Sequence, residues 1–132
     1  MNHPCIEAAY NILKNAYAPY SKFSVGAAIQ SEGNTFLGVN VENASYGLTC
    51  CAESSAIAMM VTSGFQKIDT IAIVSSSGQY TYPCGACLQR IAEFSHDQTV
   101  VLLHSTDQGS ITHTLSELLP YKFDKSSLST TV

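Results

Sequence analysis

Two cysteine-containing segments, each at the start of an expected helix, constrain this chain more than any other feature. The first is Cys51-Ala52-Glu53 and the second is Pro83-Cys84-Gly85-Ala86-Cys87. Cys84 and Cys87 are three residues apart, so both lie on one face of the first turn of their helix. Cys51 and Glu53 can share a target only just beyond the helix N-terminus, toward which helical side chains lean. We therefore expect the fold to bring two helix N-termini to one point.

Three cysteine sulfurs at that point predict a zinc site. Each helix N-terminus carries a partial charge of about +0.5, which favours an ionised sulfur. Three protein ligands leave the fourth tetrahedral position of zinc open for water, as in a catalytic site. A cysteine two residues before a glutamate, followed by PCxxC, is also the pattern of zinc deaminases. We therefore predict Cys51, Cys84 and Cys87 as ligands and Glu53 as the catalytic acid and base.

Two other interpretations of the cysteines stay open at this point. The CxxC spacing of Cys84 and Cys87 also occurs in thiol redox proteins, in which Glu53 would have no role. Cys50 could close the fourth zinc position, which would make the chain a non-catalytic, zinc-stabilised interaction module. Against this, adjacent residues at a helix start diverge by about 100°, so only one of Cys50 and Cys51 should point at a metal. Cys5 is expected to be a small buried apolar residue of the first helix.

Hydrophobic periodicity predicts strands that alternate with helices. Helices are expected from an N-cap at Asn2 to about Tyr17, at 51–61, at 84–94 and at 115–119; strands are expected at 24–31, 35–42, 68–74 and 100–103, the first two joined by Glu32-Gly33-Asn34. Small and apolar residues surround the 51–61 helix, which is therefore expected to be buried on nearly every face. This alternation indicates a mixed α/β sheet that helices cover on two faces.

Length and composition indicate one domain over residues 1–132, with a mobile tail from about residue 125. The 132 residues are 45% hydrophobic and 12% charged, which provides a core and excludes a disordered chain. Arg90 is the single arginine and the net charge is −4, so we expect no nucleic acid as partner. No stretch approaches the roughly 20 uninterrupted apolar residues that cross a bilayer, so we expect no membrane partner either. The start of the chain lacks the pattern of a secretory signal, so a cytoplasmic protein is expected.

Four segments resemble the small homotetrameric cytidine deaminases, in order from about Ala8 to Phe123. They are Tyr20-Ser21-Lys22-Phe23-Ser24-Val25-Gly26-Ala27-Ala28, Asn40-Val41-Glu42-Asn43-Ala44-Ser45-Tyr46-Gly47, and the two cysteine segments. The resemblance implies a three-layer α/β/α sandwich around a mixed, mostly five-stranded sheet, and one zinc ion per chain on the three cysteines. It implies hydrolysis of cytidine, and of deoxycytidine, to the uracil nucleoside and ammonia in pyrimidine salvage, with Glu53 moving the protons. A related nucleoside or a nucleoside antibiotic is the alternative substrate.

The same resemblance implies roles for residues outside the zinc motif. Asn40 and Glu42 match residues that hold the ribose 3′-hydroxyl, and without the zinc motif they would be interpreted as turn residues at a strand end. Phe23 matches the aromatic residue that packs on the pyrimidine, and Ala52 matches a substrate-binding position. Ala44, Tyr46 and Phe123 match positions that each subunit lends to the active site of its neighbour, which implies a homotetramer with shared active sites.

The sequence departs from the family in the charges near the cysteines. Many members carry an arginine just after the catalytic glutamate and another just after the last cysteine, where this chain has Ser54 and Leu88. Three thiolates leave a zinc site with a net negative charge, which such arginines would moderate. Arg90 is three residues past Cys87 and so on the same helix face. We predict that Arg90 takes over part of this role.

Overall fold

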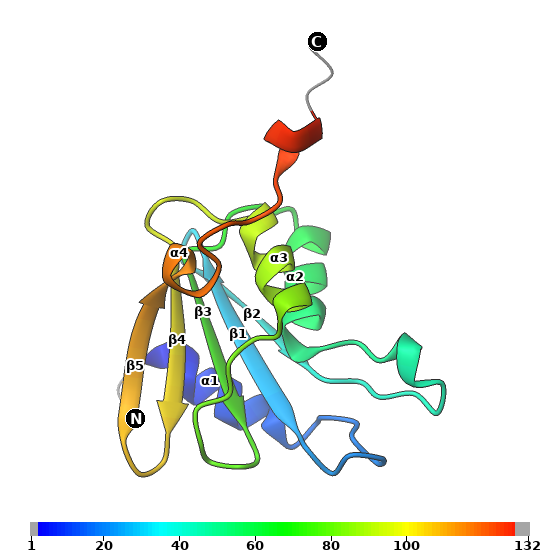
Figure 1. Cartoon of the computed structure of the whole chain (residues 1–132). Helices are drawn as coiled ribbons and strands as arrows, with labels where there is room; N and C mark the ends of the chain where they lie inside the picture. The colour runs from blue at the N-terminus through cyan, green and yellow to red at the C-terminus, as the bar shows by residue number, and fades with distance from the viewer. Residues whose placement is uncertain (1–2, 129–132) are drawn as a thin grey trace.

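A five-stranded mixed sheet with helices on both faces makes up the body of the protein (Figure 1). The computed structural model describes residues 3–128. In chain order the elements are α1 (Pro4–Leu13), β1 (Val25–Ser31), β2 (Asn34–Val39), the 3-10 helix η1 (Tyr46–Leu48), α2 (Ala52–Thr62), β3 (Thr70–Ser75), α3 (Gly85–Glu93), β4 (Val100–Ser105), β5 (Gly109–Thr114), α4 (Leu115–Leu118) and the 3-10 helix η2 (Lys125–Leu128). None of the helices between residues 3 and 128 combines the length and the apolar character that a membrane span requires.

The sheet has the order β2-β1-β3-β4-β5, in which β3 and β4 run parallel and all other neighbours run antiparallel. Helix α1 lies on one face, while α2 and α3 lie side by side on the other (Figure 1). Successive strand residues face opposite layers: Ile71 and Ile73 pack in the core beneath α2 and α3, whereas Ala72 and Val74 pack against α1. The predicted three-layer α/β/α architecture is thus confirmed.

Two glycines set the distance between the sheet and its covering helices. An added Cβ at Gly38 of β2 would lie 2.3 Å from the backbone nitrogen of Ala56 and 2.5 Å from the carbonyl oxygen of Ala52, both in α2. On the opposite face, a Cβ at Gly26 of β1 would lie 2.5 Å from the carbonyl oxygen of Ala9 in α1. Helix α2, which begins next to Cys51, therefore rests directly on the backbone of β2.

The ends of α1 and β2 differ most from the prediction, while the other predicted elements differ by one or two residues at their ends. Helix α1 ends at Leu13 rather than near Tyr17, and its N-cap is His3, whose Nδ1 accepts a hydrogen bond of 3.1 Å from the Cys5 N–H. The predicted cap Asn2 lies outside the described residues. Strand β2 ends at Val39 rather than at residue 42, since the backbone then bonds to Tyr17 instead of β1: the Tyr17 N–H donates to Asn40 O and the Glu42 N–H donates to Tyr17 O.

Two further predictions were wrong. The prediction from periodicity missed β5, because this edge strand alternates half-buried and exposed residues and contains no apolar run. Helix α2 is not buried on every face: Met60 is fully buried, but 52% of Met59 and 39% of Val61 are exposed. The four residues before 129 form η2, and the rest of the tail predicted to be mobile lies outside the described part of the chain.

Candidate metal centre and active site

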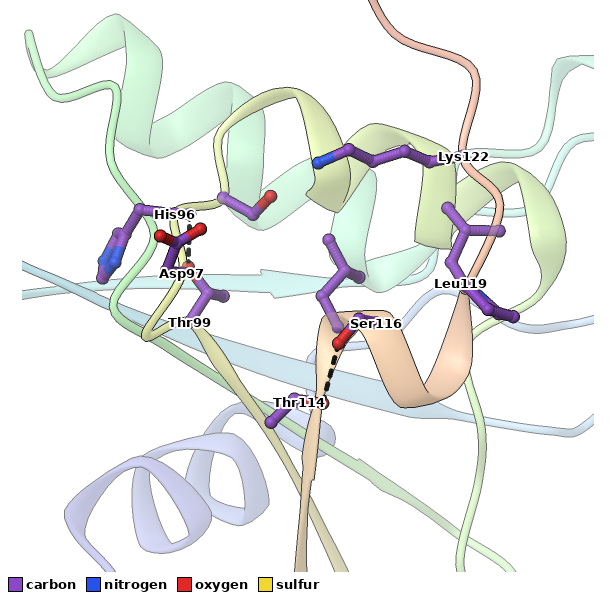
Figure 2. Close-up of a pocket in the computed structure, with 10 residues that line it drawn as sticks. His96, Asp97, Thr99, Thr114, Ser116, Leu119 and Lys122 are labelled. Atoms are coloured by element: carbon purple, nitrogen blue, oxygen red, sulfur yellow. Dashed lines mark hydrogen bonds between the residues drawn. The ribbon is translucent and has the colours of Figure 1, made fainter.

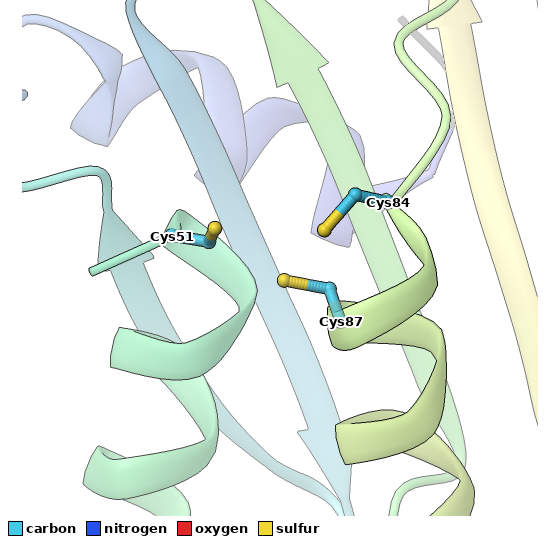
Figure 3. A group of neighbouring side chains, drawn as sticks. All are labelled: Cys51, Cys84 and Cys87. Atoms are coloured by element: carbon cyan, nitrogen blue, oxygen red, sulfur yellow. The ribbon is translucent and has the colours of Figure 1, made fainter. Parts of the chain in front are cut away.

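The three predicted cysteine ligands lie together between the starts of α2 and α3. The Sγ atoms of Cys51, Cys84 and Cys87 all lie within 4.8 Å of one another. Figure 3 shows the three sulfurs pointing toward a common centre from the two adjacent helices. Because the cluster joins residues more than 30 positions apart, the packing of α2 beside α3 creates it.

Both helices begin in the same way at this cluster. Cys51 is the N-cap of α2 and Cys84 is the N-cap of α3, each with an extended backbone conformation. The predicted helix starts at 51 and 84 were therefore one residue early, and the two cysteines project from just outside the helices. The backbone N–H groups of Cys87 and Ala86 lower the pKa of Cys84, as expected for a thiol at a helix N-terminus.

Burial raises the pKa of the other two thiols, those of Cys87 and Cys51. Cys87 is only 1% exposed. Neighbouring negative charges, Glu53 among them, raise both further. Three adjacent thiolates therefore require a cation among them.

A zinc ion fits these residues. A tetrahedral zinc with Zn–S bonds of ~2.3 Å separates its sulfurs by about 3.8 Å, which the 4.8 Å cluster reaches with a small contraction. Three sulfur donors favour zinc over the hard cations calcium and magnesium. No carboxylate or histidine belongs to the cluster within residues 3–128, so the protein supplies three ligands.

Glu53 lies on the first turn of α2, two residues after Cys51. Only 5% of the residue is exposed. Burial is the largest effect on its carboxyl group and raises the pKa, while its own backbone N–H, Cys87 and the charge of Arg90 act in the opposite direction. A carboxyl group whose pKa is raised toward the working pH is better suited to accept and donate a proton in turn.

Asn40 and Phe23 lie next to each other where β1 begins. The Asn40 Nδ2 donates a hydrogen bond of 2.8 Å to the Phe23 carbonyl oxygen, and the Val25 N–H donates one of 2.9 Å to Asn40 Oδ1. Asn40 is 8% exposed, whereas Phe23 is 39% exposed. Asn40 therefore fixes the backbone on both sides of residue 24, and the Phe23 ring remains accessible.

Glu42, two residues after Asn40, makes a second link between the segment after β2 and the segment before β1. The backbone N–H groups of Tyr20 and Ser21 donate to Glu42 Oε1 at 3.0 and 3.1 Å, and the Ser21 hydroxyl donates to Oε2. These bonds, with that of the Ser21 hydroxyl first, lower the pKa of Glu42. The segment before β1 and the segment after β2 are thus held together by side-chain bonds from Asn40 and Glu42.

The remaining predicted residues differ in exposure. Ala52 is fully buried, while Ala44 is exposed and 75% of Tyr46 is exposed. Both exposed residues belong to the loop between β2 and α2, which projects from the body in turquoise in Figure 1. Tyr46 contacts Tyr20, with ring centroids 6.1 Å apart.

Phe123 is held by a residue that the sequence analysis did not select. Gln89, on α3, accepts a hydrogen bond of 3.3 Å from the Phe123 N–H at Oε1 and donates one to the Phe123 carbonyl oxygen from Nε2. The backbone of the C-terminal segment is thereby fixed to the helix that carries Cys87, while 58% of Phe123 remains exposed. No sequence spacing indicates this pair, because its members are 34 residues apart.

Cys50 and the histidines lie apart from the metal cluster. The Cys50 thiol is exposed and faces the Leu48 carbonyl oxygen at 3.9 Å, which argues against a fourth ligand at this position. A cavity of about 230 Å³ between α4 and the loop before β4 is lined by His96, Thr114 and Lys122, among others (Figure 2). It contains none of the predicted site residues, and His96 is already bonded to Asp69 at 2.8 Å.

Comparisons with known proteins point to one family. The family described as "Cytidine and deoxycytidylate deaminase zinc-binding region" matches residues 2–103. The chain is 43% identical to a cytidine deaminase of Mycoplasma genitalium over 116 residues, which cover 87% of this chain and 89% of the relative. It is 43% identical to a cytidine deaminase of Halalkalibacterium halodurans, with 89% and 90% covered.

Solved structures agree with the sequence relatives. The crystal structure of cytidine deaminase from Burkholderia pseudomallei superposes with a TM-score of 0.86 at 39% identity, covering 93% of this chain and 99% of the other. The cytidine deaminase from Mycobacterium tuberculosis gives a TM-score of 0.80 at 33% identity, covering 91% and 94%. The described fold thus has counterparts among solved cytidine deaminase structures.

Proposed function

This chain belongs to the cytidine and deoxycytidylate deaminase family, and from that premise we propose that it hydrolyses cytidine, and deoxycytidine, to the uracil nucleoside and ammonia. The observation that carries the proposal is the cluster of three cysteine sulfurs at two helix N-termini with the buried carboxyl group of Glu53 on the same first turn. Such a cluster could hold the zinc ion of a hydrolytic deaminase.

Cys51, Cys84 and Cys87 would hold that ion. When bound, zinc lowers the pKa of a coordinated water to about 7, so that a nucleophile is available at neutral pH. Glu53 takes a proton from the attacking water and delivers it to N3 of the pyrimidine. The water oxygen bonds to C4; Glu53 then takes the second proton from this oxygen and delivers it to the amino group, whose bond to C4 breaks to release ammonia. The raised pKa of Glu53 supports both transfers, since the group must accept and donate in turn.

We infer that Asn40 and Glu42 bind the ribose and that Phe23 packs on the pyrimidine. Asn40 makes two of the four hydrogen bonds that an amide can make, so one donor and one acceptor site remain. Glu42 accepts three bonds and retains further lone pairs. A sugar hydroxyl both donates and accepts hydrogen bonds, so it can bond to Asn40 and to Glu42 at once. The accessible ring of Phe23, whose backbone Asn40 fixes, lies beside them.

We propose further that four copies assemble and share their active sites. Ala44 and Tyr46 lie on one projecting segment and Phe123 on another, and both segments extend away from the body of the chain (Figure 1). Apolar residues are unusually exposed around them: Leu48 is 66% exposed, Tyr121 94% and Leu128 67%. Met59, on the exposed side of α2, is a further exposed apolar side chain. A partner copy that covers these side chains explains their character.

We propose the cytoplasm as the place of this reaction, in the recovery of pyrimidines from nucleosides. All five cysteines are unpaired, which suits a compartment that keeps thiols reduced. The open metal cluster also depends on reduced sulfur, since a disulfide between any two of its members would remove the site.

Purified protein is expected to consume cytidine, and removal of zinc is expected to stop it. The loss of cytidine absorbance should be measured with the protein as isolated, after dialysis against a chelator, and after addition of one zinc ion per chain. We expect activity to fall to background after chelation and to return with zinc. Protein that contains zinc and leaves cytidine and deoxycytidine unchanged would contradict the proposal.

Mixing two inactive variants is expected to restore activity if subunits share their sites. Glu53→Gln chains keep Phe123 but lack the proton carrier, whereas Phe123→Ala chains keep Glu53. After the two are unfolded and refolded together, some sites combine an intact Glu53 from one chain with an intact Phe123 from another. We expect turnover well above that of either variant refolded alone, and gel filtration at the mass of four chains. Mixtures no more active than the better single variant would exclude Phe123 from a neighbour's site.

A further inference from the structure

Arg90 makes a contact with the metal cluster that the cysteine motif itself does not contain. It lies on α3, and its Nη1 is 3.8 Å from Cys87 Sγ, within hydrogen-bonding reach of a sulfur acceptor. The contact follows from helix geometry, because Arg90 is three residues after Cys87 and a long side chain on a helix leans toward the N-terminus. The guanidinium group therefore covers the sulfur that α3 buries most deeply.

Among residues 3–128, no acidic side chain forms an ion pair with Arg90. Both ion pairs found between residues 3 and 128 involve histidines, namely His96 with Asp69 and His113 with Glu117. The charge of Arg90 instead acts on Cys51 and Glu53, where it opposes the effect of burial on each pKa. Arg90 is also the chain's single arginine. The one guanidinium group of the protein thus faces the cluster of sulfurs.

A cysteine cluster that holds zinc needs a positively charged side chain such as Arg90 beside it. Three thiolates and a divalent ion leave one net negative charge at a site where Cys87 is buried, Cys51 half-buried and Cys84 exposed, and an ionised Glu53, itself buried, adds another. The N-termini of α2 and α3 offset part of this charge. A guanidinium group adds a full positive charge and an N–H donor that can bond to a thiolate without displacing it from the metal.

We propose that Arg90 is a positioning residue that retains the metal: it bonds to the Cys87 sulfur and offsets the negative charge of the loaded site. This inference rests on the proposed zinc function and adds to it a residue outside the ligand and acid-base set. Groups that bond to metal ligands from outside commonly contribute 10- to 100-fold to metal affinity. Because Arg90 is partly exposed to solvent, we expect an effect of about tenfold.

The test measures zinc affinity directly. Wild-type protein, Arg90→Ala and Arg90→Lys are titrated with zinc against a competing chelator under reducing conditions. We expect Arg90→Ala to bind zinc about tenfold more weakly and Arg90→Lys to lie between the two. Lys14→Ala is the matched control, because it removes one positive charge next to α1, on the opposite face of the sheet, and should keep wild-type affinity. Equal affinities for wild type and Arg90→Ala would overturn the proposal.

A second measurement separates metal retention from a purely structural role. Unfolding temperatures are compared with zinc bound and with zinc removed. We expect Arg90→Ala to lower the unfolding temperature of the zinc-bound protein by clearly more than that of the zinc-free protein. An equal loss in both forms would overturn the proposal, as would no loss in either. Since neither readout requires turnover, the result is independent of whether wild-type protein deaminates cytidine.

Discussion

Glu53→Gln is expected to reduce kcat by about 10²- to 10⁴-fold, the usual contribution of general acid-base catalysis. Glutamine has nearly the shape of glutamate, but its amide neither accepts nor releases a proton near neutral pH, so both proposed proton transfers are lost. Zinc content should stay at one ion per chain, because the cluster of ligands consists of Cys51, Cys84 and Cys87 alone. The measurement is steady-state cytidine turnover together with metal analysis. A Glu53→Gln enzyme with near wild-type kcat would contradict the assignment.

The same substitution should stabilise the zinc-free protein. Burial raises the pKa of Glu53 above its ordinary value of about 4.5, so the folded state binds the proton more tightly than the unfolded state. The free energy of unfolding of the wild type therefore falls as the pH rises from 4.5 through the raised pKa, and the loss persists above it. Glutamine does not titrate. We expect the gain in unfolding temperature of Glu53→Gln to be largest above the raised pKa and to vanish below pH 4.5.

Glu93→Gln is the matched control for both effects. Glu93 is the last residue of α3 and is exposed, so its carboxylate interacts mainly with water. This variant should keep wild-type turnover and show no comparable pH-dependent gain in stability. A gain of equal size in Glu93→Gln would attribute the effect to net charge rather than to the burial of Glu53.

The metal cluster could be predicted from the sequence because helix geometry is local and strict. Cys84 and Cys87 had to share one face, and Cys51 and Glu53 could converge only at a helix N-terminus. The same rule predicted that Arg90 reaches Cys87, and the 3.8 Å contact agrees with it. What the sequence could not supply was the strand order β2-β1-β3-β4-β5, on which the placement of α2 beside α3 depends.

Predictions failed where long-range contacts override local pattern. Gln89 fixes Phe123 across 34 residues, and neither residue belongs to a recognisable spacing. Strand β5 was missed because an edge strand needs only one apolar side. Met59 was expected in the core from its apolar neighbours, although in the single chain half of it faces outward. The contact between Gln89 and Phe123 required knowledge of a partner distant in sequence, whereas β5 and Met59 depart from the apolar pattern on which the prediction was based.

Gly38→Ala is expected to damage stability and catalysis together. The added Cβ meets the backbone of Ala56 and Ala52 at 2.3 and 2.5 Å, and backbone atoms cannot rotate away as a side chain would. Overpacking typically costs 1–3 kcal/mol, and we expect about 3 kcal/mol here. Relief requires α2 to move away from β2, and α2 carries Glu53 and begins next to Cys51. Zinc affinity and kcat should therefore fall by at least about tenfold.

Gly26→Ala provides the matched comparison on the other face of the sheet. Its added Cβ meets the carbonyl oxygen of Ala9 at 2.5 Å, so it forces α1 outward and should lower the free energy of unfolding by a similar amount. Helix α1 contributes no residue to the cysteine cluster. We expect Gly26→Ala to retain zinc affinity and kcat at temperatures at which it is folded. Urea unfolding and chelator competition on both variants provide the measurement. If both variants lose stability and both keep zinc, the position of α2 against β2 does not control the metal site.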